Sequence, residues 1–283
     1  MVRGLVVLFA ARTVARAYRK NGTRWVWRGA GSTTAAVVIC QVAAVPATAQ
    51  TYTYTTINNP SATATIAWGI NNAGQIVGDD SSNRGFLYSG GVFTPIAVPQ
   101  AISNTVAFDI NNAGQIVGAY NAGAAGFLYS GGIYTSLSRA AYGINDSGVI
   151  VGYTPNSATN TGYIYSGGIY TSLSVPGSVF TFPTGINDKG QIVGGWSNPG
   201  AGVLIDGFLY SNGVFTTLNV PGSTYTNAWG INEEGQIVGD YADASGVHPF
   251  RYSNGVYVTL VDPLLTNLAY AQGINDFGQI VGQ

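Results

Sequence analysis

Acidic side chains are the residues of this sequence best suited to chemistry, and they occur in two close pairs. Asp79 and Asp80 are adjacent, and Asp240 and Asp243 are three positions apart. Two carboxyl groups about 5–10 Å apart can cleave a glycosidic bond. Any acidic loop brings carboxylates this close, however, and two further aspartates, Asp206 and Asp262, fall near the same part of each repeat. The sequence therefore favours a solvated acidic rim over a catalytic or cation site.

Nucleophilic catalysis has few candidate residues. Cys40 is the only cysteine, and it lies in a leader segment that we expect to be removed; His248 is the only histidine. A Cys-His pair is thereby excluded, and a Ser-His-Asp triad would depend on His248 alone. The sequence also lacks a phosphate-binding loop, a zinc-ligand spacing and a dinucleotide fingerprint. We expect no catalysis and no cofactor.

Asparagine, acidic residues and glycine recur in a ten-residue phrase of the form Gly-Ile-Asn-x-x-Gly-Gln-Ile-Val-Gly. Calcium loops use the same residue types, but calcium takes about six to eight oxygen ligands. Each phrase offers at most two acidic side chains, so we interpret the phrases as structural turns with no metal. The phrases lie at residues 69–78, 109–118, 143–152, 185–194, 230–239 and 273–282.

Each phrase predicts a tight turn between antiparallel strands. Asparagine followed three residues later by glycine suits a type I turn with a left-handed glycine, which gives a bulged hairpin. The asparagine oxygen, at Asn71 for example, is expected to accept a hydrogen bond from the backbone two residues on. The turn asparagines are Asn71, Asn111, Asn145, Asn187, Asn232 and Asn275. The closing glycines, which avoid a Cβ clash, are Gly74, Gly114, Gly148, Gly190, Gly235 and Gly278.

The phrases are separated by 40, 34, 42, 45 and 43 residues, a spacing typical of repeat architectures. The unit at 207–239 reads as four short strands with turns between them and no helical period. Consecutive apolar residues, as in Ile116-Val117, imply that the sheets are buried on both faces. Four-stranded antiparallel sheets covered by their neighbours indicate a β-propeller. We predict an all-β propeller of about six four-stranded blades.

The first blade is predicted to be incomplete. Residues 54–57 (Tyr-Thr-Thr-Ile) align with residues 215–218 and supply its start, but no aromatic strand precedes them. The aromatic strand of the repeat occurs only five times, beginning at Phe86, Phe127, Tyr163, Phe208 and Phe250.

The variable loops are expected to gather at one end of the blades, because both tight turns of each blade fall at the other end. Binding residues often lie on loops held by a rigid scaffold. Aromatic and acidic residues follow the last glycine of most phrases, with Thr154 in one copy, and such rings can stack on sugars or grip a peptide. Rings that cap the blade ends as core would give the same pattern. The predicted ligand-binding residues are Tyr120, Tyr153, Trp196, Tyr241, Asp80 and Asp240.

The first 49 residues form a basic and apolar leader. Residues 35–45 are a short apolar run preceded by Arg24 and Arg28 and followed by Ala47-Thr48-Ala49, which is typical of a signal peptide cleaved near Ala49. The run is too short for a membrane span. The remaining residues 50–283 hold four basic and twelve acidic residues, a net charge of −8. This charge repels phosphate backbones, so we expect no nucleic-acid partner.

The phrase, a variable loop and a Phe-Leu-Tyr strand together resemble the HAF repeat of bacterial extracellular proteins, over residues 54–283. The resemblance implies export and repetition but no defined activity. The family is named for His-Ala-Phe before the aromatic strand, and only His248-Pro249-Phe250 keeps the histidine here. Whatever that histidine does in the family, it is not general to this chain.

These observations predict a secreted or cell-surface protein that acts as a non-catalytic binding or structural module. Its partner would be a polysaccharide or an envelope protein, contacted through the variable-loop face. An alternative is a polysaccharide-degrading hydrolase or lyase that uses acidic rim residues. A third reading is an incomplete copy whose ring does not close.

Overall fold

The computed structural model describes residues 52–153, 161–198, 206–261 and 270–283, together with four short N-terminal strands. The N-terminal strands, which pair as β1 with β4 and β2 with β3, are β1 (Leu8–Phe9), β2 (Tyr18–Lys20), β3 (Arg24–Val26) and β4 (Val37–Val38). The expected cleavage site near Ala49, Cys40, Thr154 and Asp262 lie outside the described residues, and of the apolar run 35–45 only Val37 and Val38 are described.

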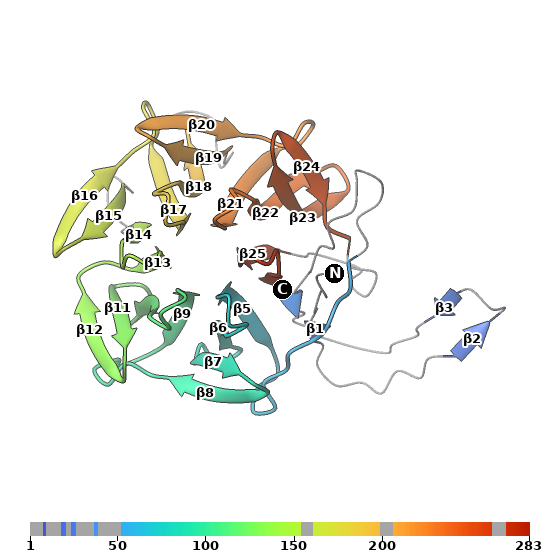
Figure 1. Ribbon diagram of the computed structural model, residues 1–283, viewed down its shortest axis with the longest axis horizontal. Helices are drawn as coiled ribbons and strands as arrows, with labels where there is room; N and C mark the ends of the chain where they lie inside the picture. Colours follow the sequence, from blue (N-terminus) through green and yellow to red (C-terminus); the bar gives the residue numbers. More distant parts are fainter. Residues whose placement is uncertain are drawn as a thin grey trace.

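Five four-stranded antiparallel sheets surround a central axis, with their first strands innermost and their fourth strands at the periphery (Figure 1). Blade one contains β5 (Thr65–Ile70), β6 (Ile76–Asp80), β7 (Gly85–Ser89) and β8 (Val92–Ile96). Blade two contains β9 (Thr105–Ile110), β10 (Ile116–Tyr120), β11 (Ala125–Ser130) and β12 (Ile133–Leu137). Blade three contains β13 (Ala141–Ile144), β14 (Ile150–Tyr153), β15 (Gly162–Ser166) and β16 (Ile169–Leu173).

The chain continues around the ring with the same strand order. Blade four contains β17 (Phe180–Ile186), β18 (Ile192–Ser197), β19 (Asp206–Ser211) and β20 (Val214–Leu218). Blade five contains β21 (Tyr225–Ile231), β22 (Ile237–Asp243), β23 (Gly246–Ser253) and β24 (Val256–Thr259). The sixth place in the ring holds a two-stranded sheet, β25 (Ala271–Ile274) with β26 (Ile280–Gly282).

The predicted all-β propeller is confirmed. In the described part of the chain five blades are complete and the sixth has two paired strands. The prediction that the first blade is incomplete is wrong, because each sheet begins with the inner strand that leads into a phrase, and β5–β8 is therefore complete. No helix in this part is long and apolar enough to cross a membrane. The core lies between the blades, where each second strand places valine and isoleucine side chains against opposite neighbours, as Val77 and Ile76 do.

The predicted turns are also confirmed. In the first phrase the Gly74 amide donates to the Asn71 carbonyl over 3.0 Å, and the Asn71 amide donates to the Gln75 carbonyl over 3.1 Å. All six closing glycines are left-handed, with φ between 71° and 76°. The Asn71 oxygen accepts the Ala73 amide two residues on over 3.1 Å, as expected. In every phrase the asparagine oxygen also accepts the backbone amide four residues on, as Asn71 does from Gln75 (3.0 Å).

The turn asparagines form a closed ring around the axis. Each Nδ2 donates to the backbone carbonyl of the equivalent asparagine in the next blade over 3.0–3.2 Å, and Asn275 returns the series to Asn71. A second ring follows at the next residue, whose side chain accepts the backbone amide of its counterpart in the preceding blade. Its members are Asn72, Asn112, Asp146, Asp188, Glu233 and Asp276. The ring closes, so the reading of an unclosed copy is wrong.

Candidate functional site

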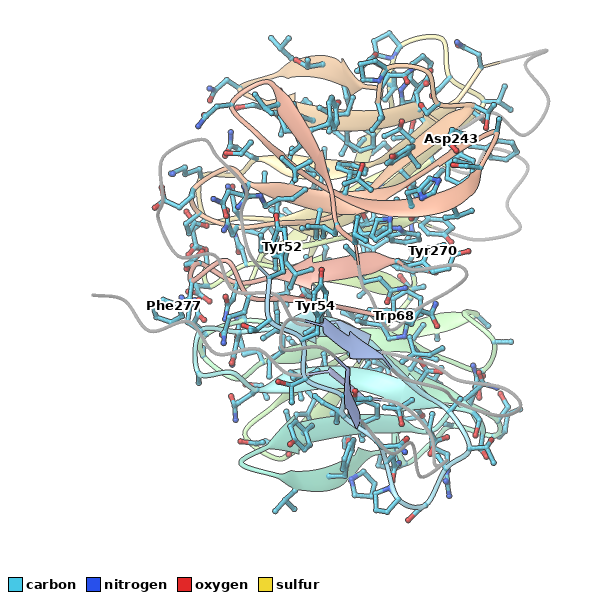
Figure 2. All side chains as sticks on the ribbon, turned by 90° about the vertical axis from the view of Figure 1, so that its right-hand side faces the viewer. Tyr52, Tyr54, Trp68, Asp243, Tyr270 and Phe277 are labelled. Atoms are coloured by element: carbon cyan, nitrogen blue, oxygen red, sulfur yellow. The ribbon has the colours of Figure 1, made fainter. Side chains whose placement is uncertain are left out.

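The axis of the propeller is a channel whose two ends differ in width and polarity. At the variable-loop end it opens into a cavity of about 750 Å³. It narrows to spaces of about 50 Å³ at its waist and about 70 Å³ at the asparagine rings. Figure 2 shows the molecule from the side, with Phe277 at the turn end and Trp68, Tyr270 and Asp243 toward the opposite end. We call the wide end the mouth.

A β-bulge in each inner strand places a variable side chain at the channel. The strand register shifts by one residue just before the first residue of each phrase, which is glycine in five of the six, as between Ala67 and Gly69. A bulge leaves one residue unpaired and re-aims its side chain. The glycine that follows allows close packing, because a Cβ on Gly69 would lie 2.8 Å from the backbone of Asp109. The bulged residues are Trp68, Phe108, Tyr142, Thr184, Trp229 and Gln272.

Aromatic rings form a continuous arc around the mouth. Trp68 lies 6.2 Å from Trp229 and 5.2 Å from Phe108, and Phe108 stacks on Tyr142 at 4.4 Å. Tyr142 then stacks on Tyr153 at 4.7 Å, and the arc continues to Phe182, 6.0 Å from Tyr153. All six rings are partly exposed and line the cavity. They come from five blades, so only the assembled propeller creates this surface.

Two buried carboxyl groups hold the tryptophans of the arc. Trp68 Nε1 donates to Asp79 Oδ1 over 2.6 Å, and Trp229 Nε1 donates to Asp240 Oδ1. Burial raises the pKa of Asp79 to about 6, although the indole hydrogen bond opposes the rise. Burial also raises the pKa of Asp240 to about 6, against the hydrogen bonds from Trp229 and Tyr225, which lower it. Near neutral pH a fraction of these carboxyl groups therefore keeps a proton.

Asp109 is a departure from the repeat at the waist, since the other five phrases begin with glycine. Its Oδ1 accepts the Ile110 amide and its Oδ2 accepts the Ile144 amide of the next blade, both over 2.9 Å. Burial raises its pKa to about 7 despite these bonds, and the charge of Asp146 adds to the rise. Asp109 joins two blades.

The predicted binding residues are divided between the mouth, the core and the outer loops. Tyr153 lines the mouth. Tyr120 is buried, packs in the core between blades one and two, and its hydroxyl donates to Ser136, so it does not lie on an exposed binding surface as a ligand-binding residue would. Trp196 is partly buried against the core between blades three and four. Tyr241 packs on the ring of His248. For Tyr120 and Trp196 the interpretation as core at the blade ends fits the structure.

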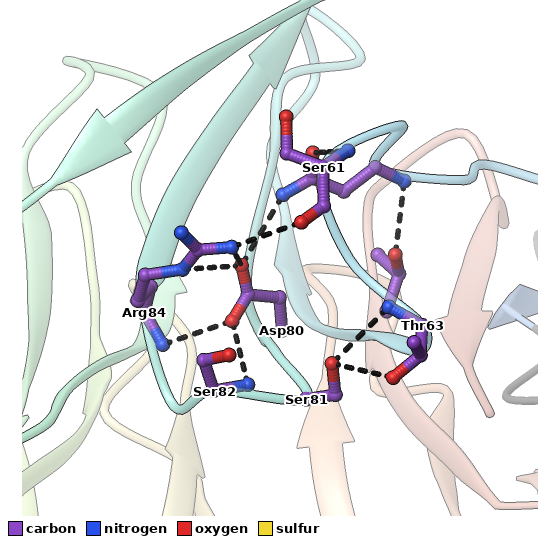
Figure 3. Close-up of polar contacts among 8 residues, drawn as sticks. Ser61, Thr63, Asp80, Ser81, Ser82 and Arg84 are labelled. Atoms are coloured by element: carbon purple, nitrogen blue, oxygen red, sulfur yellow. Dashed lines mark hydrogen bonds and ion pairs between the residues drawn. The ribbon is translucent and has the colours of Figure 1, made fainter.

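The predicted carboxylates are buried in structural roles. Asp80 is only 2% exposed, accepts the Arg84 guanidinium over 2.8 Å and also accepts the Ser82 amide, which fixes the β6–β7 turn (Figure 3). Asp240 is equally buried and holds Trp229 at the back of the mouth. The expected solvated rim is therefore wrong for Asp79, Asp80 and Asp240. Asp206 is partly exposed and outside the cavity lining.

Ser245, His248 and Asp243 cluster at the β22–β23 turn, but their geometry differs from a catalytic triad. The Ser245 hydroxyl and Asp243 Oδ1 both contact the same nitrogen, His248 Nε2, at 2.9 and 3.1 Å. A triad requires the serine and the carboxylate on opposite nitrogens. The serine also donates directly to Asp243, and these bonds lower the pKa of Asp243 to about 2. The cluster stabilises an exposed turn.

The described residues contain no group of three or more histidine, cysteine or acidic side chains placed to hold a metal ion. The acidic residues of the second ring accept backbone amides instead, as Asp146 does from Asn112 and Asp188 does from Asp146.

Comparison with known proteins supports the fold. No protein-family model and no curated protein match the chain. Among solved structures, a putative TolB from Agrobacterium tumefaciens is similar with a TM-score of 0.58 and 14% identity, covering 77% of this chain and 88% of that one. The propeller domain of the Trilobed protease from Pyrococcus furiosus is similar with a TM-score of 0.51 and 12% identity, covering 94% of this chain and 87% of that one. A gluconolactonase from Xanthomonas campestris is similar with a TM-score of 0.50 and 13% identity, covering 77% of this chain and 86% of that one.

Proposed function

We propose that this protein is a non-catalytic binding module, exported to the cell surface or the medium, whose aromatic mouth holds a segment of a polysaccharide. The aromatic arc around a cavity of about 750 Å³ carries this proposal. Ligand cavities of a few hundred to about 1,000 Å³ are usually lined by apolar and aromatic side chains with a few polar groups. The basic and apolar leader supports export.

The chemistry of the mouth favours a ligand with apolar ring faces and without negative charge. Aromatic rings pack on apolar surface while leaving polar edges accessible. Asn227 and Ser197 supply polar groups to the lining, and Asn227 Oδ1 is buried without a hydrogen-bond partner among the described residues. Among the described residues no basic side chain lines the cavity, whereas Asp79 does. A neutral or amine-bearing sugar chain meets these requirements better than an anionic one.

The test is a glycan array screened with the full chain, followed by titration of each selected glycan. Phe182→Ala and Tyr153→Ala each remove one ring of the arc, and we expect each to weaken binding about tenfold or more. Tyr241→Ala is the matched control because Tyr241 is outside the lining of the cavity. An unselective array, or binding that Phe182→Ala leaves unchanged, would contradict the proposal, and selective capture of an envelope protein instead would replace it.

A second candidate function, cleavage of the bound glycan by a hydrolase or lyase mechanism, is favoured by Asp79. Its pKa of about 6 keeps part of the carboxyl protonated near neutral pH, as a general acid requires. Release of reducing or unsaturated sugar ends near pH 5–6, lost in Asp79→Asn, would support catalysis. If Asp79→Asn retains the release of sugar ends, the acid role of this residue is wrong.

A further inference from the structure

The mouth contains two carboxyl groups that form no ion pair within the described part of the chain. Asp79 lines the cavity and is 4% exposed, and Asp240 lies behind Trp229 and is 2% exposed. The ion pairs of the described residues involve other acidic side chains. A buried carboxylate without an opposite charge costs free energy, so a positively charged ligand would relieve an unfavourable arrangement.

The repeat region itself offers no basic side chain to the mouth. Residues 50–283 contain four basic residues and one histidine, none of which lines the cavity: Arg84, Arg139, Lys189, Arg251 and His248. The segments 154–160, 199–205 and 262–269, which lie outside the described residues, contain no lysine, arginine or histidine. The other basic residues belong to the leader that we expect to be removed. A positive charge at the mouth therefore has to come from a ligand.

The two tryptophans of the arc place the negative charge of these carboxyl groups beside aromatic faces. Trp68 Nε1 donates to Asp79 Oδ1 over 2.6 Å, and Trp229 Nε1 donates to Asp240 Oδ1. An organic cation within about 6 Å of an indole centroid is attracted by the ring. The carboxylate bonded to the same ring adds a Coulombic attraction, which an apolar lining screens less than water does. The two indole centroids are 6.2 Å apart, so one cation can lie within this range of both.

We propose that this tryptophan corner, made of Trp68, Trp229, Asp79 and Asp240, is a binding site for an organic ammonium group. The inference rests on the proposed function and narrows it, because the glycan held by the mouth would then carry free amines. The aromatic lining disfavours an inorganic cation such as calcium, which takes about six to eight oxygen ligands. An alkylammonium group instead combines positive charge with a surface that packs on aromatic rings.

The first test titrates the full chain with two probes of similar size, tetramethylammonium chloride and uncharged tert-butanol, at constant ionic strength. We expect a saturable change in tryptophan fluorescence with tetramethylammonium, and binding at least about tenfold weaker with tert-butanol. Asp79→Asn keeps an acceptor for Trp68 Nε1 but removes the charge, so it should weaken tetramethylammonium binding about tenfold. Asp206→Asn is the matched control and should change nothing, because Asp206 is outside the cavity lining.

Competition then identifies the molecule that carries the ammonium group. A glucosamine oligosaccharide should displace tetramethylammonium and should bind at least about tenfold more tightly than its N-acetylated counterpart, which has the same sugar rings without the charge. The titrations are made at pH 6.5, because the pKa of Asp79 is about 6 and the sugar amine still holds its proton. Displacement by tetralysine but not by the oligosaccharide would assign the site to a protein partner and overturn the glycan as its ligand.

The outcomes separate this inference from the proposed function. If tetramethylammonium does not bind, binds no better than tert-butanol, or binds a folded Asp79→Asn variant equally well, the ammonium site is wrong, whereas selective binding of uncharged glycans would still support the proposed function. If no glycan of the array binds but tetramethylammonium does, the proposed function is wrong and the ammonium site stands. The comparison of the two probes uses the unaltered chain, so it decides the matter even if Asp79→Asn does not fold.

Discussion

The two ends of the central channel use the repeat in opposite ways. At the turn end every blade supplies the same asparagine, and its donors and acceptor are used on its own turn or on the next blade. At the mouth the bulged position varies in type from blade to blade, and the rings leave a cavity instead of filling it. The difference indicates that repetition marks what holds the ring together, whereas departures from it mark where a ligand can be recognised.

The turn end should be the more sensitive to mutation. In Asn187→Ala the Gln191 amide loses its side-chain acceptor, and the Asn232 carbonyl loses one of its two donors and keeps the Gly235 amide; both positions are buried or partly buried. We expect the free energy of unfolding to fall by about 2–4 kcal/mol, measured by urea denaturation. Asn187→Asp keeps the acceptor but replaces the Nδ2 donor by an oxygen that faces two acceptors, Gln191 Oε1 and the Asn232 carbonyl, so it should cost at least as much as the alanine variant. A loss below about 1 kcal/mol for Asn187→Ala would remove the distinction between the two ends.

A matched pair of tyrosines near the mouth tests whether a residue stabilises the fold or serves ligand binding. Tyr120→Ala empties a buried position and should destabilise the fold by about 3 kcal/mol. Tyr153→Ala removes a partly exposed ring and should cost about 1 kcal/mol, while it weakens ligand binding. Thermal and urea unfolding of both variants provide the measurement. Equal destabilisation by the two substitutions would mean that the aromatic arc is core.

The carboxyl groups of the channel predict a pH dependence that the outer surface does not share. Asp79, Asp109 and Asp240 each have a higher pKa when folded than when unfolded, reaching about 6, 7 and 6. The folded state therefore holds these protons more tightly, so stability is greatest near pH 4 and falls as the pH rises toward 7. At about 1.4 kcal/mol for each unit of pKa difference, the expected change between pH 4 and 7 is of order 2–3 kcal/mol per group.

Thermal unfolding between pH 4.5 and 7.5 measures this dependence, and Asp79→Asn should flatten it. The range stops at pH 4.5 because Asp243 has a lowered pKa of about 2 and acts in the opposite sense below about pH 4. A Tm that rises steadily with pH over this range would show that the channel carboxyl groups are not buried as described.

The smallest effect is expected outside the channel. Tyr241→Ala loses a hydrogen bond to Thr259 at an exposed position, so the free energy of unfolding should change by about 0.5 kcal/mol or less. Glycan binding should also be unchanged. A loss of binding in this variant, by titration, would move the site from the mouth to the outer loops.

The fold could be predicted because its determinants are local. The Asn-x-x-Gly turns and the consecutive apolar residues of strands such as Ile116-Val117 need no knowledge of distant contacts. The asparagine rings could not be predicted, because each Nδ2 bond joins residues 34–45 positions apart or, at the closure, 204 positions apart.

The mouth was missed for a related reason. The predicted aromatic residues, such as Tyr120 and Trp196, follow the phrase, whereas most rings of the arc lie on the inner strands just before it. Only Tyr153 lies in both sets. One signal was present in the sequence: the residue just before each phrase varies, from Trp68 to Gln272, between neighbours that repeat. This variation points to the channel only once the β-bulge is known, and the bulge is defined by the hydrogen-bond register of the strands, which the sequence alone does not give.

The closed asparagine ring also constrains how such a protein can change in size. A helix ends with unpaired amides and carbonyls, but a head-to-tail circle of amides has no first donor and no last acceptor. Insertion or loss of one whole repeat leaves a circle of another circumference with every partner restored. If only part of a repeat is inserted or lost, and that part does not include the turn asparagine, the number of asparagines in the ring stays the same. The number of asparagines in the ring can therefore change only by whole repeats of 34–45 residues.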